Sequence, residues 1–527
     1  MSFQTKVKLV SVESGIAAIG FRKIAAMVRL LNCSSEIYFV PNDNLYSFKS
    51  HFLPGKNILL NSDSIIKIAH SLADADVICF SSMTASATYV EKIASNIKKI
   101  NKKSMLIWGG IHPTLYPHES IKYVDAICIG EGDLPIKLLI EGLQSDIYPT
   151  NIPNMWFKLK NGIKKNKLLP LNSCQLLDTL PHSYNQNDCY IYDFSKCKFR
   201  SFNKFDYTNY NGLLYRTVWT RGCPFNCSYC ANESFIKLDL DYSRLRYPSV
   251  NYILEEIKLA RKHHPYISTI AFYDDNFIAL PLPVINEFCE KYKKEINLPF
   301  VVFGFHPNLV NKEKVELLAS AGMNRARMGI QSGSKETLQF YNRPTTIRKI
   351  KESSNILADA ARKYKMIPPS YDIISDNPIE TNENIRATLK LIYGLKRPFT
   401  LTIFSLRVFP KTQLYDYVEK HPKIRNHFRK SSYLDIQMNL NNITLYLLAT
   451  FKPPKFIFDK LFSMVADKKS NLKRYPFLFY IVKSIYLIKR GIDHIYHFDF
   501  STIVGKWTYY IWKFDMNTKS WTRTYLS

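Results

Sequence analysis

The stretch RGCPFNCSYC occupies residues 221–230 and places Cys223, Cys227 and Cys230 in the spacing CxxxCxxC. The preceding stretch LLYRTVWT, at 213–220, is typical of a β-strand that leads into a loop. A tetrahedral zinc site uses four nitrogen or sulfur ligands, whereas this loop offers three thiolates. Three thiolates in one loop suit a [4Fe–4S] cube, in which each cysteine holds one iron. The fourth iron then lacks a protein ligand and can coordinate a small molecule.

Two other interpretations of this loop stay open. The thiols could form a zinc knuckle that is completed by a ligand from elsewhere in the chain, or they could be three idle thiols. We favour the cluster because the three cysteines directly follow a predicted strand. The other seven cysteines are scattered, several within apolar runs, as buried free thiols often are, so a disulfide framework is not expected.

Composition restricts the class of protein. The chain has 527 residues, enough for about three or four domains. With 72 Lys and Arg against 44 Asp and Glu, its net charge of +28 fits either an anionic partner or a solvated lysine-rich surface. The N-terminus lacks a signal-peptide core, and no apolar run reaches the ~18 residues that a spanning helix needs. We therefore expect a cytoplasmic protein.

Predicted strands and helices alternate over residues 1–145. Such alternation indicates an α/β domain with a doubly wound, Rossmann-like parallel sheet whose two faces are covered by helices. The strands are expected at 6–12, 36–40, 76–82, 104–110 and 125–133, and the helices at 15–31, 63–72 and 88–100.

Small and polar residues follow four of these strands. Parallel sheets bind ligands at the carboxyl ends of their strands, and glycine lets a large ligand approach the backbone. Tight turns without a ligand are the alternative, and we favour the ligand. His112 is either a metal ligand or a turn-shaping residue, and we favour the turn. The candidate binding residues are Ser14, Gly15, Ser82, Met83, Thr84, Gly109, Gly110, His112, Gly130, Glu131 and Gly132.

The stretch RGCPFNCSYCAN resembles the cluster loop of radical S-adenosylmethionine (SAM) enzymes. In that family the open iron binds the amino and carboxylate groups of SAM, and electron transfer cleaves SAM to a 5′-deoxyadenosyl radical. The resemblance implies that Tyr229 lies near the adenine. It also implies that Asp274 or Asp275 lies near the amino group, and that Gln331, with Ser332 beside it, contacts the ribose. Relatives often carry Glu where this chain has Gln331.

Repeated strand–helix units over 213–415 suggest a partial (β/α)6 radical SAM barrel, whose site lies at the carboxyl ends of its strands. Together with the first domain, this arrangement resembles the cobalamin-binding class of radical SAM methyltransferases (class B). The stretch 109–133 is very similar to that class, and the resemblance covers residues 5–415. The DxHxxG motif that supplies an axial histidine in many cobalamin proteins is absent. If cobalamin binds, Met83 and Thr84 are expected to face its lower side.

The leading hypothesis is cobalamin-dependent methylation of an unactivated carbon of a small molecule, with an external flavodoxin-type or ferredoxin-type reductant. The second is radical SAM chemistry without methyl transfer, such as ring formation, contraction or carbon–carbon bond formation on a lipid or porphyrin-like substrate, with a vestigial B12 domain. A methylthiotransferase would need three further cysteines in its first domain, where only Cys33, Cys79 and Cys128 occur. A nucleic-acid-binding module would leave the cysteine loop unexplained, so no nucleic acid is expected.

Two further segments complete the organisation. Residues 146–212 are expected to be an irregular linker. Residues 416–527 are expected to form a basic, aromatic, helical C-terminal domain with 19 Lys and Arg against 8 Asp and Glu. The stretches 474–498 and 506–514 mix apolar, aromatic and basic residues, so they could lie in a membrane interface or form a helical cap over the barrel. We favour the cap. The interfacial alternative implies peripheral membrane contact and a lipid or isoprenoid substrate.

Overall fold

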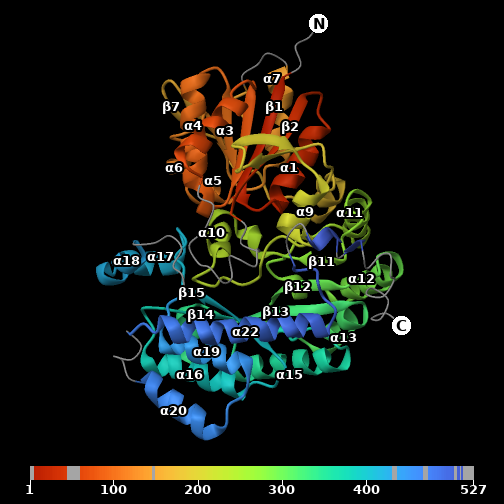
Figure 1. The fold of residues 1–527 in the computed structure, drawn as a ribbon. Helices are drawn as coiled ribbons and strands as arrows, with labels where there is room; N and C mark the ends of the chain where they lie inside the picture. Colours follow the sequence, from red (N-terminus) through yellow and green to blue (C-terminus); the bar gives the residue numbers. More distant parts are fainter. Residues whose placement is uncertain are drawn as a thin grey trace. The chain divides into compact units, whose positions relative to one another are not determined.

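The computed structural model describes residues 5–43, 60–144, 149–429, 436–466, 473–503, 507–510 and 512–513 (Figure 1). The chain divides into two compact units. The first comprises Met1–Arg216, Asn251–Ser268 and Ser501–Thr524, and the second comprises Thr217–Val250, Thr269–Phe500 and Tyr525–Ser527.

The first unit contains a nine-stranded sheet of the order β7-β6-β5-β4-β3-β1-β2-β8-β9. Its central strands are parallel, and β1 lies between β3 and β2 as in a doubly wound sheet. The apolar residues of β1, such as Val7, Val10 and Val12, have no exposed surface. The fold expected for this part is therefore confirmed. The elements are β1 Lys6–Ser14, α1 Ile19–Arg29, β2 Ser34–Asp43, α3 Ser62–Leu72, β3 Val77–Ser82, η1 Thr84–Ser86, α4 Ala87–Ile100, β4 Met105–Gly109, α5 Ile111–Leu115, α6 Pro117–Ser120, β5 Ala126–Cys128 and α7 Asp133–Gln144.

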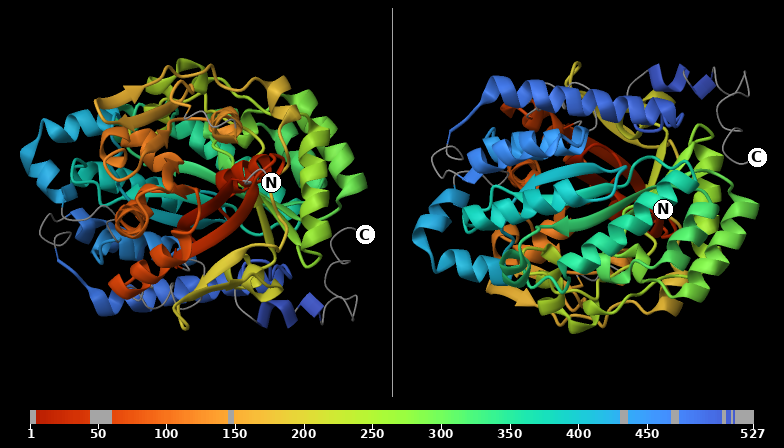
Figure 2. Two further views of the ribbon diagram at one scale, coloured as in Figure 1. Left: turned by 90° about the horizontal axis from the view of Figure 1, so that it is seen from above. Right: turned by 90° about the horizontal axis from the view of Figure 1, so that it is seen from below.

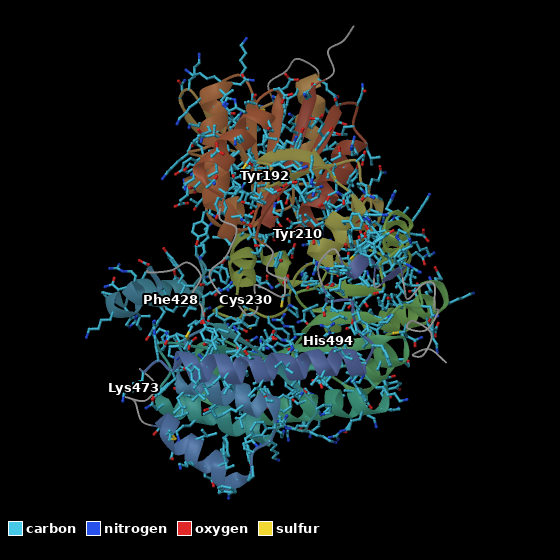
Figure 3. All side chains as sticks on the ribbon, in the orientation of Figure 1. Tyr192, Tyr210, Cys230, Phe428, Lys473 and His494 are labelled. Atoms are coloured by element: carbon cyan, nitrogen blue, oxygen red, sulfur yellow. The ribbon has the colours of Figure 1, made fainter. Side chains whose placement is uncertain are left out.

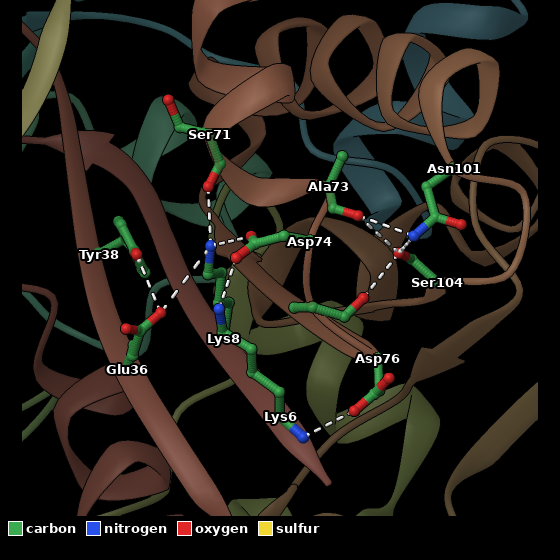
Figure 4. Close-up of polar contacts among 11 residues, drawn as sticks. Lys6, Lys8, Glu36, Tyr38, Ser71, Ala73, Asp74, Asp76, Asn101 and Ser104 are labelled. Atoms are coloured by element: carbon green, nitrogen blue, oxygen red, sulfur yellow. Dashed lines mark hydrogen bonds and ion pairs between the residues drawn. The ribbon is translucent and has the colours of Figure 1, made fainter.

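A buried lysine fastens the start of β1 (Figure 4). Lys8 is 2% exposed, and its Nζ donates to the Ser71 carbonyl oxygen at 2.7 Å and to the Asp74 carboxylate. Glu36 on β2 lies 3.8 Å from the same nitrogen. Because the lysine charge is hydrogen-bonded and paired, its burial within the strand is tolerated.

The segment expected to be an irregular linker instead extends the first sheet at both edges. β6 pairs antiparallel with β5 and carries the hairpin partner β7, while β8 pairs with β2 and carries β9. These edge strands are only four or five residues long and carry polar residues, so their apolar runs are too short to identify them. The elements of this segment are β6 Met155–Leu159, β7 Gly162–Lys165, α8 Cys174–Thr179, β8 Tyr190–Asp193, β9 Lys198–Ser201 and α9 Lys204–Asn211.

A second sheet of six strands follows the chain order β10-β11-β12-β13-β14-β15. The pairs from β11 to β15 are parallel, and a helical segment connects each strand to the next, as expected for a partial (β/α)6 barrel (Figure 2). The elements are β10 Leu214–Thr217, α10 Ala231–Leu238, η2 Leu240–Ser243, α11 Val250–His263, β11 Thr269–Phe272, η3 Phe277–Ala279, α12 Leu282–Glu295, β12 Phe300–Phe305, η4 Pro307–Leu309, α13 Lys312–Ser320, β13 Met323–Gln331, α14 Lys335–Phe340, α15 Ile347–Lys363, β14 Ser370–Ser375, α16 Asn382–Gly394 and β15 Thr400–Ser405.

The C-terminal part of the second unit is helical, as expected. Its longest helix, α22 Pro476–Tyr496, packs on α19 through Tyr446, whose ring lies 5.8 Å from that of Phe479 and 5.2 Å from that of Tyr486. Most of the stretch 506–514 is described only in fragments, and Lys506, Ile511 and Phe514 lie outside the described residues. No described helix combines the length and the apolar character that crossing a bilayer demands. The other helices here are α17 Gln413–Glu419, α18 Pro422–Arg429, α19 Leu440–Thr450 and α20 Lys455–Ala466.

Candidate cluster and cofactor sites

A glycine anchors the cysteine loop to the neighbouring backbone. Gly222 has φ 95°, and a Cβ added there would lie 2.4 Å from the Arg244 carbonyl oxygen and 2.7 Å from that of Tyr242. The Cys223 amide donates to the Tyr242 carbonyl oxygen at 3.1 Å. Only glycine allows this approach, because no side chain could move aside to relieve a contact with backbone oxygens.

The three predicted thiols lie close together. Cys223 and Cys227 are buried, Cys230 is half-buried, and the Cys230 amide donates to the Cys227 carbonyl oxygen at 3.0 Å (Cys230 is labelled in Figure 3). Burial raises the pKa of Cys223 to about 11 and also raises the pKa of Cys230, and the Cys227 thiol adds to both effects. Without a positive centre between them, these groups would therefore stay protonated thiols.

The three thiols of the loop are the donor set that a cluster takes. Within the described ranges, no three His, Cys, Asp or Glu side chains are grouped as ligands of a single metal ion. A cubane takes each thiolate on a different iron, so its cysteines need not converge on one point. Bound metal deprotonates coordinating thiols and so reverses the pKa effect of burial. The donor set therefore fits a [4Fe–4S] cube.

Arg343, which the sequence analysis missed, lies against the loop. It is 8% exposed, and its Nη1 lies 3.6 Å from Cys227 Sγ and 3.1 Å from the Tyr229 hydroxyl oxygen. Its Nη2 donates to the Gly329 carbonyl oxygen. A guanidinium at this position stabilises negative charge on the neighbouring thiolate. Arg343 follows α14 in the turn YNRP, which carries no spacing signal that would have identified it.

The two predicted aspartates have different surroundings. Asp274 is 3% exposed, and its carboxylate accepts hydrogen bonds from the Thr220 amide at 2.5 Å and the Trp219 amide at 3.4 Å. Burial raises the pKa of Asp274 to about 6. Asp274 therefore holds the segment between the end of β10 and the cysteine loop in place.

Asp275 faces the cysteine loop instead. Its side chain is exposed, its Oδ2 accepts a hydrogen bond from the Tyr242 hydroxyl at 3.3 Å, and its carboxylate adds to the raised pKa values of Cys223 and Cys230. Partial desolvation by the surrounding protein also raises the pKa of Asp275. Of the two aspartates, Asp275 is the one placed to meet a cationic group near the thiols.

Gln331 and Ser332, although adjacent in the chain, also have different surroundings. Gln331 ends β13 with φ 72°, and its Nε2 would lie 2.5 Å from a Cβ added to Gly329, close to where Arg343 also approaches. A non-glycine residue rarely adopts this left-handed conformation. Ser332 is fully buried, and its hydroxyl donates to Glu380 Oε1 at 3.2 Å and accepts from the Ser334 amide at 3.1 Å. Ser332 therefore supports the loop and has no exposed surface for a ligand.

Tyr229 packs between the loop and the barrel, with its ring 4.9 Å from that of Tyr341. Two residues before Gly329 on β13, Arg327 donates through Nε to the Asp372 carboxylate at 2.7 Å. The rings of Phe303 and Phe404 lie 5.4 Å and 5.2 Å from the Arg327 guanidinium. These half-buried groups give the sheet face beside the loop both a charged pair and flat apolar surfaces.

In the first unit, the sheet order brings the predicted edge residues onto four adjacent strands, β1, β3, β4 and β5. Gly15, Gly110 and Gly130 have positive φ angles, and a Cβ on Gly110 would lie 3.1 Å from the Ser82 carbonyl oxygen. No atom lies within 4 Å of a Cβ placed on Gly130, so that turn is open. Ser14 and Gly109 end β1 and β4, and a Cβ on Gly132 would meet Ile24 at 3.4 Å.

The other candidates at this edge differ in how far their side chains are exposed. Ser82 is buried and its hydroxyl accepts from Trp108 Nε1 at 3.0 Å, while Glu131 accepts from the Asn172 amide at 2.7 Å. Met83, in contrast, is 44% exposed. The hydroxyl oxygen of Thr84 is buried and finds no hydrogen-bond partner among the residues that the structure describes.

His112 and Glu13 are two titratable groups at this edge whose pKa values are shifted by burial. His112 is buried between the rings of Trp108 and Tyr116, each 5.0 Å away, and burial lowers its pKa to about 4. This stacking agrees with the turn-shaping interpretation. Glu13, near the end of β1, was not singled out, and burial raises its pKa to about 7. The edge thus offers an open turn at Gly130, which would leave room for a large ligand.

Comparison with known proteins gives two family matches, the radical SAM superfamily over residues 217–392 and the B12 binding domain over residues 5–140. An uncharacterized methyltransferase of Pyrococcus horikoshii is 25% identical over 380 residues, which are 70% of this chain and 75% of that protein. The bacteriochlorophyllide d C-8(2)-methyltransferase of Chlorobaculum tepidum is 23% identical over 362 residues, which are 65% of this chain and 68% of that protein.

A solved structure has a similar fold. The radical SAM methyltransferase TsrM from Kitasatospora setae, with a tryptophan substrate and a SAM analogue bound, superposes with a TM-score of 0.61 at 14% identity. The match covers 79% of this chain and 76% of that protein. At this identity the likeness shows the shared fold.

Proposed function

We propose that this chain, which carries a B12-binding domain and a radical SAM domain, is a cobalamin-dependent methyltransferase that acts on an unactivated carbon of a small molecule. The radical SAM domain makes the chain an enzyme of that superfamily. The observation that carries the proposal is the arrangement of a guanidinium, from Arg343, and a carboxylate, from Asp275, against the three thiols of one loop.

This arrangement complements an amino-acid group at an open iron. SAM ends in a carboxylate and an ammonium group, and Arg343 and Asp275 carry the opposite charges. Gln331, whose Nε2 approaches Gly329 as Arg343 Nη2 does, would hydrogen-bond a hydroxyl of SAM, and Tyr229 would supply a ring against the loop. Cys223, Cys227 and Cys230 would hold the cluster. Ser332 and Asp274 position these groups through their own hydrogen bonds.

In the first unit, the open turn at Gly130, the close approach at Gly110 and the exposed Met83 would receive the corrin. When bound, the cluster, SAM and cobalamin supply hydrogen abstraction and methyl donation, which an unactivated carbon requires. The residues of the chain bind these groups, orient them and exclude water. An external one-electron reductant of the flavodoxin or ferredoxin type, a lipid or isoprenoid substrate, and peripheral membrane contact through the C-terminal region belong to the proposal.

Anaerobic reconstitution with iron, sulfide and hydroxocobalamin tests this function. Absorption spectra report the cluster and the corrin separately. With SAM and a reductant, methylation predicts both 5′-deoxyadenosine and S-adenosylhomocysteine. Formation of 5′-deoxyadenosine alone would favour the non-methylating alternative, and a Cys227→Ser variant that still forms it would refute the cluster assignment.

A further inference from the structure

The longest helix of the second unit exposes an apolar face to solvent. Eight large side chains of α22 are between 40% and 81% exposed, and we call them the outer face of α22. Figure 2 shows α22 running along the outside of this unit. The outer face consists of Phe477, Leu478, Ile481, Ile485, Ile488, Ile492, Ile495 and Tyr496.

These residues form one continuous surface. They recur at intervals of one, three or four residues, so at 3.6 residues per turn they share an arc of about 100° along the whole helix. The opposite side of α22 buries Phe479, Val482 and Tyr486 against the protein. Since that side is fixed, the outer face cannot rotate into the core. An ordinary surface helix places polar residues on its solvent side.

The size of the outer face requires a partner. At roughly 100 Å² for each half-exposed large side chain, it exceeds the few hundred Å² that soluble monomers commonly expose in one patch. The helix is too charged to cross a bilayer, because it carries Lys483, Lys489 and Arg490. These three side chains are half-buried and lie off the outer face. A helix with this distribution lies along an apolar boundary.

Two occupants fit such a face, a second copy of this chain and a lipid surface, and charge distinguishes between them. A second copy of a chain with a net charge of +28 would be repelled, whereas an anionic lipid surface would be attracted. Lys473 and Arg474 are exposed directly before the helix, where they can reach lipid phosphates. Phe477 and Tyr496 lie at the two ends of the face; Tyr is enriched at the headgroup depth of a bilayer, and Phe on the apolar face of interfacial helices.

We propose that the outer face of α22 docks the protein on an anionic lipid bilayer, with the helix lying in the interface. The inference names the surface for the membrane contact included in the proposed function. It needs neither cluster nor corrin, so its failure and the failure of the proposed methylation are distinguishable.

Co-sedimentation of the full-length protein with vesicles tests this docking. We expect binding to vesicles that contain equal parts of phosphatidylcholine and phosphatidylglycerol, and at least ten-fold weaker binding to pure phosphatidylcholine. Binding to the mixed vesicles should weaken as salt rises. A wild-type protein that stays in the supernatant with both vesicles would overturn the proposal.

The double variant Ile488→Glu/Ile492→Glu locates the contact. These side chains are 58% and 59% exposed, so the melting temperature should stay unchanged while vesicle binding falls at least ten-fold. The matched control is Leu30→Glu, which adds a charge at a 72% exposed leucine of the first unit and should leave binding intact. Equal loss in both variants would refute the assignment to α22. A wild-type dimer that the double variant converts to a monomer, with no effect on vesicle binding, would assign the outer face to a second copy.

Discussion

Replacing Gly222 by alanine tests whether the cysteine loop depends on its backbone anchor. The φ angle of 95° costs a residue with a Cβ about 1–3 kcal/mol. The Cβ would also lie 2.4 Å from the Arg244 carbonyl oxygen and 2.7 Å from that of Tyr242, so the loop must move away. That movement breaks the hydrogen bond from the Cys223 amide, which contributes about 0.5–1.5 kcal/mol. The native loop should therefore lose about 2–4 kcal/mol, a roughly 30- to 700-fold shift toward displaced conformations.

Iron content after anaerobic reconstitution measures this effect. Gly222→Ala should retain far less iron per chain than the wild type and should show weaker cluster absorbance. Gly162→Ala is the matched control, because Gly162 has φ 123° but no atom lies within 4 Å of its Cβ position on β7. It should show a small loss of melting temperature and a normal iron content. Equal iron contents in wild type and Gly222→Ala would refute the role assigned to the anchor.

Three other changes address separate features of the second unit. Burial raises the pKa of Glu380 to about 7, so the stability that its protonated form contributes is present at low pH and is lost as pH rises through 7. In urea unfolding, Glu380→Gln should therefore be more stable than the wild type by about 2–3 kcal/mol at pH 8 but not at pH 5. A difference in stability that does not change with pH would contradict this. Arg343→Lys keeps the positive charge but loses the guanidinium fork. Titration with SAM, followed by the electron paramagnetic resonance spectrum of the reduced cluster, should therefore need about ten-fold more SAM for the same spectral change. An unchanged titration would exclude a role of Arg343 in binding SAM. Arg325 lies 2.9 Å from the buried Asp499, so Arg325→Met should lower the free energy of unfolding by about 3–5 kcal/mol. The double variant Arg325→Met/Asp499→Asn should recover much of that loss. Equal melting temperatures for the wild type and both variants would argue against the ion pair.

The sequence predicted the core elements of both sheets because apolar runs mark buried parallel strands. The run at 6–12 corresponds to β1, and that at 104–110 to β4. The edge hairpin of β6 and β7 escaped prediction although Asn161 and Gly162 form a turn signal. The apolar run of β6 is only three residues long, Met155 to Phe157, and β7 is exposed along most of its length and carries two lysines.

Prediction of the site succeeded where the signal was local. The three cysteines lie within eight residues, and their spacing alone indicates a cluster. Asp274 and Asp275 are neighbours in sequence, and only the fold shows that Asp274 turns back to the Thr220 amide while Asp275 faces the thiols. Arg343 reaches the loop from more than a hundred residues away, a contact that no single sequence encodes as a pattern.

Both candidate sites are shaped by backbone contacts that glycine permits. A Cβ on Gly304 would lie 2.3 Å from the Asp274 carbonyl oxygen, so glycine lets β12 pack against the turn that carries both aspartates. In the first unit, Gly110 approaches the end of β3 in the same manner. Because large cofactors carry the reactive groups, the protein contributes mainly their placement, and placement depends on where the backbone can run. A search for reactive side chains therefore identifies the thiols of such an enzyme. The surfaces that hold its cofactors are identified instead from the glycines and from the close backbone contacts that each glycine allows.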